Sequence, residues 1–166
     1  ISYLDEKHGS FKGAPKFPQF YLFDAMFYFF LKTDDEKYLK PVETLLKNIC
    51  SKGIYDQLAG GIARYTVDDK WIIPHFEKML YDNIQFTSLL SKFYQSTKSD
   101  YFKKKLTQTI NYINTEFVNE IGLYGSAYDA DSVGVEGKFY TWSFDELSKI
   151  LQTNLDIFNK KYLITN

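Results

Sequence analysis

The lengths of the connections between helical segments constrain this chain more than any single motif. Apolar residues repeat at helical spacing over about residues 18–32, 36–51, 74–95 and 100–119. Connections of about five residues join the first segment to the second and the third to the fourth, which predicts two antiparallel hairpins. Glycine-containing connections of about 20 residues follow each hairpin. The long loops should therefore emerge on one rim of the helical array.

Two further helices and a small hairpin are expected outside these segments. Ser143 and Glu146 have the spacing of a capping box, which predicts a shorter fifth helix. The end of the chain should begin a sixth helical segment. The RYTV and WII runs near residues 64–67 and 71–73 are β-branched and aromatic, so they favour a small β-hairpin within the long loop.

An internal repeat supports this arrangement. The run DEKHGSF from Asp5 matches DQLAGGI from Asp56, 51 residues later. Such a period indicates repeated supersecondary units, here one glycine loop followed by one helical hairpin. Such arrays form open solenoids or α/α toroids. We predict an all-α fold, a single partial α/α toroid domain with small β-hairpins in its long loops. Its parts are residues 1–52, 53–119 and 120–166, the last starting a third hairpin.

Composition excludes several classes of function. The formal net charge of -1 leaves no broad basic face for nucleic acid. The most apolar run, residues 20–31, is interrupted by Asp24 and is too short to span a bilayer. Cys50 is the single cysteine, which excludes a disulfide framework and a thiolate metal site and favours the cytosol. Aromatic residues reach 19%, which suits flat helical interfaces or a carbohydrate cleft.

Polar and aromatic residues are densest between Asp56 and Asn83, and we interpret this stretch as a site. Pro74 is expected to start the third helix, with His75 in its first turn, where the helix dipole keeps imidazole neutral. On such a helix, His75, Lys78 and Asp82 share one face, and Glu77 lies on a neighbouring face. A neutral histidine beside a carboxylate suits proton transfer. Alternatively, these groups only cap the helix and pair with the preceding loop.

A second cluster of carboxylates comprises Asp129, Asp131 and Glu136. The first two match positions one and three of a calcium loop, but Val133 and Tyr140 occupy positions that need oxygen ligands. No metal site is therefore expected. Paired carboxylates on a loop could act on a sugar as acid and base. Alternatively, they form an Asx-turn loop that caps backbone amides and pairs with Arg64 or Lys70.

Three stretches resemble one known family. GGIARYTVDDKWIIPHFEKMLYDN from Gly60, GSFKGAPKFP from Gly9 and SAYDADSVGVEGKFYTW from Ser126 are similar to the spermatogenesis-associated thioredoxin-like proteins. The chain departs from their pattern at Ile62, Tyr128 and Val133. The positions that match the family's motifs are Lys16, Asp56, Gly60, Gly61, Arg64, Tyr65, Asp68, Trp71, Pro74, His75, Glu77, Lys78, Tyr81, Asp82, Asp129, Asp131, Glu136 and Gly137.

The resemblance implies a longer protein. In it, an N-terminal thioredoxin-like domain would precede an α/α toroid similar to six-hairpin glycosidases and sugar 2-epimerases, and this chain would be the first part of the toroid. The absence of a C-x-x-C motif here fits that position. An open toroid edge would expose apolar surface, which predicts self-association.

Our leading hypothesis is a sugar-active or sugar-binding toroid that needs no cofactor. A sugar or polyol would stack on an aromatic ring while one group acts as base and another as acid. The predicted catalytic residues are His75, Glu77, Asp129 and Asp131, and the predicted substrate-binding residues are Arg64, Tyr65, Trp71, Lys78, Asp82 and Glu136. The rival hypothesis is a non-catalytic module that presents clients to the upstream thioredoxin-like domain, with the polar cluster as a structural network.

Overall fold

The computed structural model describes residues 3–162, and the ends of the first and last predicted segments, residues 1–2 and 163–166, lie outside them. The chain divides into two compact units, of which the first ends at Ala130 and the second begins at Asp131. This division falls inside the predicted third segment, 120–166. The grouping of the predicted segments into one domain therefore stays a prediction.

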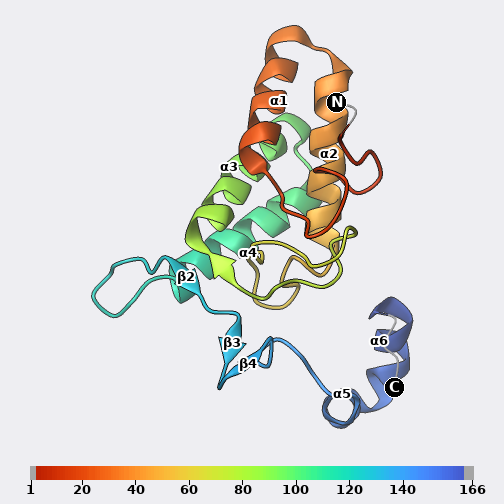
Figure 1. Ribbon diagram of the computed structural model, residues 1–166, viewed down its shortest axis with the longest axis vertical. Coiled ribbons are helices and arrows are strands. Elements are labelled where there is room, and N and C mark those ends of the chain that lie inside the picture. Colours follow the sequence, from red (N-terminus) through yellow and green to blue (C-terminus); the bar gives the residue numbers. More distant parts are fainter. Residues whose placement is uncertain (1–2, 163–166) are drawn as a thin grey trace. The chain divides into compact units, whose positions relative to one another are not determined.

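Two helical hairpins form the first unit. Helix α1 (Phe20–Thr33) packs against α2 (Glu36–Ser51), and α3 (Leu80–Thr97) packs against α4 (Asp100–Glu116). Helices α1 and α3 also contact each other, which joins the two hairpins. The short connections between α1 and α2 and between α3 and α4 lie at one end of the helices. The long loop between α2 and α3 lies at the other end (Figure 1). The mostly helical fold class and the hairpin pairing predicted from the loop lengths are confirmed.

A continuous apolar core holds the hairpins together. Phe20, Phe23 and Phe27 repeat at helical spacing on one face of α1 and are fully buried. The other buried residues of this cluster come from α2, α3, α4 and the long loop: Val42, Leu45, Leu46, Ile49, Cys50, Ile54, Tyr55, Ile62, Ala63, Trp71, Phe86, Leu89, Leu90, Phe93 and Phe102, together with Leu4 of the first loop. Burial raises the pKa of the Cys50 thiol to about 12. This thiol is therefore a core group.

The predicted repeat is a structural repeat. In both loops an aspartate carbonyl accepts a hydrogen bond from the glycine four residues later, at 2.8 Å for Asp5 and Gly9 and 3.0 Å for Asp56 and Gly60. Both glycines have positive φ. Each also lies against the backbone of a helix: a Cβ on Gly9 would lie 2.6 Å from Leu45 Cα. On Gly60 it would lie 2.8 Å from the Gln108 carbonyl oxygen.

A buried lysine closes each glycine loop. Lys16 Nζ donates to Asp5 Oδ2 at 2.8 Å, and Lys78 Nζ donates to Asp56 Oδ2 at 2.9 Å. Each ammonium also donates to a carbonyl of its own loop, that of Phe11 or Gly60. Burial lowers the pKa of Lys78, and the negative charge of Asp56 opposes that shift. We call these two pairs the lysine clamps.

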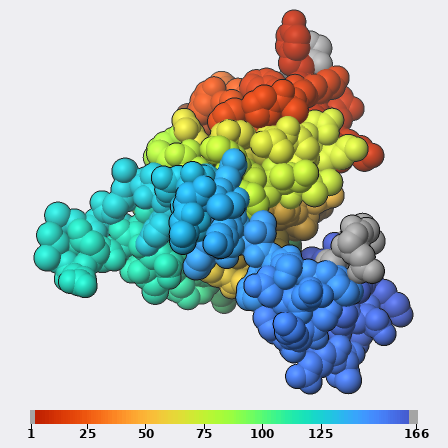
Figure 2. Space-filling view, turned by 60° about the horizontal axis from the view of Figure 1, so that its bottom comes forward, coloured from red at the N-terminus to blue at the C-terminus, as the bar shows by residue number. Residues whose placement is uncertain are grey.

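The clamp lysines also link successive loops through their backbones. Lys16 forms an antiparallel bridge with Thr66, and the first loop lies against the second (Figure 2). Lys78 lies in β1 (Lys78–Met79), which pairs antiparallel with β2 (Ala127–Tyr128) of the third loop. The glycine loops of the first unit are therefore connected in series along one rim.

The loop between α2 and α3 also contains the expected β-hairpin, although only a short part of it is paired. Thr66 and Pro74 form an antiparallel bridge, and Val67 N donates to the Ile73 carbonyl. Three backbone N–H groups, those of Lys70, Ile72 and Ile73, donate to the Asp68 carboxylate. These hydrogen bonds keep the pKa of Asp68 low although burial acts to raise it. Asp68 therefore holds the turn of the hairpin.

The second unit contains one hairpin and two short helices. Strand β3 (Asp131–Ser132) pairs with β4 (Val135–Glu136), and both turn residues, Val133 and Gly134, have positive φ. Ser143 and Glu146 form the predicted capping box at the start of α5 (Phe144–Leu151). A 3-10 turn, η1 (Gln152–Asn154), leads to α6 (Leu155–Tyr162), the expected sixth helix. Within residues 3–162, no helix is long and apolar enough to cross a membrane.

The lysine clamps give a stability prediction. Asp56→Asn keeps the shape of the side chain but leaves the Lys78 ammonium buried without its counter-charge, which should destabilise the fold by about 3 kcal/mol. Urea denaturation measures this loss. The control is Glu43→Gln, which removes the exposed ion pair with Lys47 and should cost less than about 0.5 kcal/mol. Equal losses in the two variants would contradict a structural role for the clamp.

Candidate functional site

The predicted start of the third helix at Pro74 is wrong. Residues 74–79 form a non-helical arm whose last two residues are strand β1, and α3 begins only at Leu80. Within the same loop, His75 N donates to the Tyr65 carbonyl and Arg64 N donates to the Glu77 carbonyl. The last two residues of the arm pair with β2 of the third loop. Phe76 also has φ of 65°, which is incompatible with a continuous helix. Cross-loop pairing therefore outweighs the local preference of Pro74 for a first helical turn.

This correction removes the helical reasoning about His75. Its imidazole is not at a helix N-terminus, and His75, Lys78 and Asp82 do not share a helix face. Instead, the His75 ring stacks on Tyr65, with centroids 4.6 Å apart and planes 18° apart. Tyr65 also contacts Phe17 of the first loop, with centroids at 4.7 Å. The arm thus carries His75 in a row of rings drawn from the first two loops.

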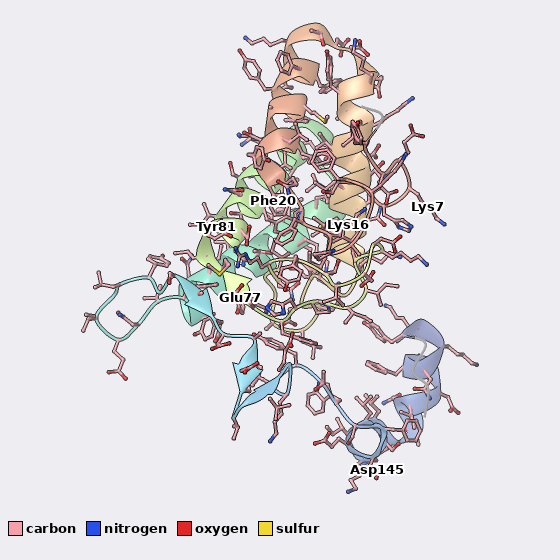
Figure 3. All side chains as sticks on the ribbon, in the orientation of Figure 1. Lys7, Lys16, Phe20, Glu77, Tyr81 and Asp145 are labelled. Atoms are coloured by element: carbon pink, nitrogen blue, oxygen red, sulfur yellow. The ribbon has the colours of Figure 1, made fainter. Side chains whose placement is uncertain are left out.

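Glu77 is held by Arg64, which precedes the arm in the same loop. Arg64 Nη1 donates to Glu77 Oε2 at 3.2 Å, and the Arg64 side chain is 40% exposed, so the pair meets solvent. Glu77 lies at the N-terminal end of α3, near Tyr81 (Figure 3). The alternative in which Glu77 pairs with the preceding loop is therefore correct in this one respect, because its carboxylate is paired with the Arg64 guanidinium.

The β1–β2 pairing brings a second carboxylate to this arm. Lys78 is opposite Tyr128 in the antiparallel register, so Glu77 and Asp129 follow as the next opposed positions. Side chains at opposed positions of antiparallel strands lie on one side of the pair. Two residues that are 52 positions apart in sequence are thereby placed at the end of one short ladder.

Asp131 and Glu136 are in the second unit and face each other there. They form one of the two residue pairs of the β3–β4 hairpin, and both are exposed. Among the described residues, no group of three histidine, cysteine, aspartate or glutamate side chains could hold a metal ion. The hairpin register, rather than a calcium-binding loop, accounts for the closeness of these two carboxylates.

Trp71 and Lys78 belong to the interior. Trp71 is fully buried, and its Nε1 donates to the His8 carbonyl at 2.7 Å, so neither ring face is available to a sugar. Lys78 is 3% exposed, and its ammonium donates hydrogen bonds to the Asp56 carboxylate and the Gly60 carbonyl. Its Nζ lies 4.2 Å from the centre of the Tyr112 ring. Both residues position the loop that carries the remaining candidates.

Asp82 is the acidic residue that the shifted helix places in the first turn of α3. It is 9% exposed, and burial raises the pKa of its carboxyl from 3.8 to about 6. The Arg64 charge and a hydrogen bond with Tyr81 oppose this shift, whereas the Glu77 charge adds to it. A carboxyl that titrates near neutral pH is suited to exchanging protons. The sequence alone carries no signal for this, because the burial comes from tertiary packing.

Known proteins are similar to this chain in sequence. Spermatogenesis-associated protein 20 from rat is 32% identical over 157 residues, and its human counterpart is 31% identical over the same length. Both alignments cover 89% of this chain and 20% of the relative. The chain is a homologue of one segment of spermatogenesis-associated protein 20. It spans about a fifth of the length of these relatives, and no family model matches it.

Solved structures similar to this homologue of spermatogenesis-associated protein 20 show the same fold. A sugar epimerase from a ruminal bacterium aligns with a TM-score of 0.65 at 18% identity, and covers 77% of this chain and 36% of its own. The cellobiose 2-epimerase of Bacillus thermoamylovorans aligns with a TM-score of 0.62 at 19% identity, with the same coverage. A D-mannose isomerase has a TM-score of 0.56. The helical hairpins are therefore those of an α/α toroid.

The raised pKa of Asp82 predicts an unusual pH dependence of stability. The pKa of Asp82 is higher in the folded state than in the unfolded state, so the folded state binds the proton more tightly. The contribution of this group to the free energy of unfolding is therefore largest below about pH 4. It is lost as the pH rises through about 6. At pH 7 Asp82→Asn should therefore stabilise the protein by about 1–3 kcal/mol. The gain should disappear near pH 4 in urea denaturation.

Asp69→Asn is the matched control, because Asp69 is exposed in the loop that precedes α3. It should change stability little at either pH. A loss of stability in Asp82→Asn at pH 7 would show that the carboxylate is well paired in the folded protein.

Proposed function

We propose that this chain is the first part of a carbohydrate-binding α/α toroid that acts on a sugar by acid–base chemistry, either epimerisation or hydrolysis. One observation carries the proposal: Glu77 and Asp129 directly flank the same end of the β1–β2 ladder, and Glu77 is two residues from His75, whose ring stacks on Tyr65. Opposed like charges weaken a two-residue ladder, so their positions favour a role other than stability. The resemblance of the fold to sugar epimerases and isomerases supports a sugar as the ligand.

The groups would divide the chemistry between them. His75 or Glu77 would take a proton from the sugar as base, and Asp129 would supply one as acid. The sugar ring would pack on the Tyr65–His75 pair, while Arg64 and Asp82 would hold its hydroxyl groups. Asp131 and Glu136 belong to the second unit and take no part in this scheme. Trp71 and Lys78 are left out, because both are buried and their polar atoms are bonded within the first unit.

The second candidate is a non-catalytic module that presents clients to a thioredoxin-like domain elsewhere in the full-length protein. The internal pairing of Arg64 with Glu77 and of Lys78 with Asp56 favours it, because such pairs connect loop to helix without a ligand. Self-association also stays a prediction, supported by Tyr21, Tyr28 and Phe29, which are exposed on α1. Sedimentation of the protein as a clean monomer would contradict self-association.

Calorimetric titration of the full-length protein with D-mannose and cellobiose tests the leading proposal. These sugars are named for the similar structures. At least one should bind, and His75→Ala or Glu77→Gln should weaken binding at least about tenfold, equal to about 1.4 kcal/mol. Asp69→Asn should bind as the unaltered protein does. The proposal fails if neither sugar binds, or if both site variants bind normally while retaining their fold.

A further inference from the structure

A cavity of about 450 Å³ lies between the first loop and the start of α2, within the first unit. Leu4 and Glu6 line it from the loop, Pro41 and Thr44 from α2, and Phe23 from α1. The first loop runs beside α2 (Figure 1). Glu6 is exposed, so the cavity opens to solvent. Its volume is that of a small-molecule site, and none of the predicted site residues lines it.

The structural repeat identifies the matching place in the second hairpin. A Cβ on Gly9 would lie 2.8 Å from Leu45 N, and a Cβ on Gly60 would lie 3.2 Å from the carbonyl carbon of Gln108. The peptide bond before Leu45 therefore corresponds to the one after Gln108, which aligns α2 with α4. The two loops align through Asp5 and Asp56, as described above. The cavity residues Leu4, Glu6, Pro41 and Thr44 thus correspond to Tyr55, Gln57, Lys105 and Gln108.

In the second repeat, these four side chains bond to one another and fill the space between loop and helix. Lys105 Nζ donates to Gln57 Oε1 at 2.7 Å and lies 4.0 Å from the centre of the Tyr55 ring. Tyr55 Oη donates to Gln108 Oε1 at 3.0 Å, and Gln108 Nε2 donates to the Leu58 carbonyl. An ammonium stacked on an aromatic ring is therefore the central part of this filling.

The first repeat has neither the ring nor the ammonium at these positions. Leu4 is smaller than a tyrosine, and Pro41 has no side-chain donor. Glu6, in contrast, carries a carboxylate, which is a stronger acceptor for a cation than the Gln57 amide. Within the part of the chain that the structure describes, the Glu6 side chain forms no hydrogen bond or ion pair. The wall of the cavity therefore retains an acceptor for an ammonium that the chain itself does not supply.

The charges around the cavity are compatible with a cationic ligand. Three charged lining residues already have partners: Asp5 pairs with Lys16, Lys37 with Asp35, and Glu43 with Lys47. Lys40 also lines the cavity and corresponds to Lys104. Lys104 is close enough to lower the pKa of Lys105, yet Lys105 donates to Gln57. A lysine at this position therefore does not exclude an ammonium.

We propose that this cavity binds a small arylalkylamine, whose aromatic ring packs on Leu4 and Pro41 and whose ammonium donates to the Glu6 carboxylate. The ligand supplies to the first repeat the ring and the ammonium that Tyr55 and Lys105 supply to the second. This site lies apart from the residues proposed to act on a sugar and does not depend on that function.

Calorimetric titration of the full-length protein with 2-phenylethylamine tests the cavity, and 2-phenylethanol is the neutral probe of the same shape. The alcohol should bind at least about tenfold more weakly than the amine, because it cannot form the charge-assisted hydrogen bond. Glu6→Gln should weaken binding of the amine by a similar factor. The control is Glu36→Gln, which removes an exposed carboxylate of α2 outside the cavity and should leave binding unchanged.

A second variant fills the cavity from within. Pro41→Lys places a lysine where the second repeat has Lys105, so its ammonium should reach Glu6 and abolish binding of the amine. Pro41→Ala is the control and should retain binding. Both variants remove a proline from inside α2, so neither should be less stable than the unaltered protein. Loss of binding in Pro41→Lys alone could therefore not be ascribed to unfolding.

L-phenylalanine distinguishes the two sources of such an ammonium. Tighter binding of L-phenylalanine than of the amine would identify aromatic amino acids as the ligand, with the carboxylate beside Lys40. Weaker binding would identify amines without a carboxylate. The inference is wrong if neither compound binds, if 2-phenylethanol binds as tightly as the amine, or if Glu6→Gln and Pro41→Lys bind normally. None of these results bears on sugar binding, so the proposed function is tested separately.

Discussion

Two buried lysine–aspartate pairs hold the rim of the first unit in place. Lys16 with Asp5 and Lys78 with Asp56 each tie the start of a glycine loop to the segment that enters the next helix. A buried ammonium is tolerated only with a close counter-charge and additional acceptors, which the loop carbonyls supply. The requirement fixes the path of each loop, and with it the position of every candidate site residue in the first unit.

The same lysines connect one repeat to the next, so the site arises from three loops. The backbone of Lys16 pairs with the second loop and that of Lys78 with the third. The extended arm before α3 results from this pairing. It places His75 against Tyr65, sets Glu77 opposite the position of Asp129, and moves Asp82 into the first turn of α3. Structural clamp and candidate site therefore share one short segment.

Sequence reasoning located the right segments and misjudged one local conformation. The helical hairpins, the repeat and the capping box at Ser143 follow from spacing and composition, because these are local properties. The preference of Pro74 for a first helical turn is also a local property, yet residues 74–79 are not helical. Backbone bonds to residues 64–66 of the same loop and to β2 of the third loop outweigh that preference, and no local pattern encodes a partner as distant in sequence as β2. Trp71 shows the same limit, since its burial comes from packing with the first loop.

The sequence by itself determined which residues form helices, that the long loops emerge together, and which polar residues are concentrated near the rim. Local spacing and connection length suffice for those properties. Only the tertiary structure decided which of these polar residues are buried and how each of them is paired. Lys78 and Asp82 are four residues apart and both are buried. Lys78 has a counter-charge at 2.9 Å, whereas an oxygen of Asp82 is left unbonded. The physical reason is that burial and pairing depend on neighbours brought together by folding.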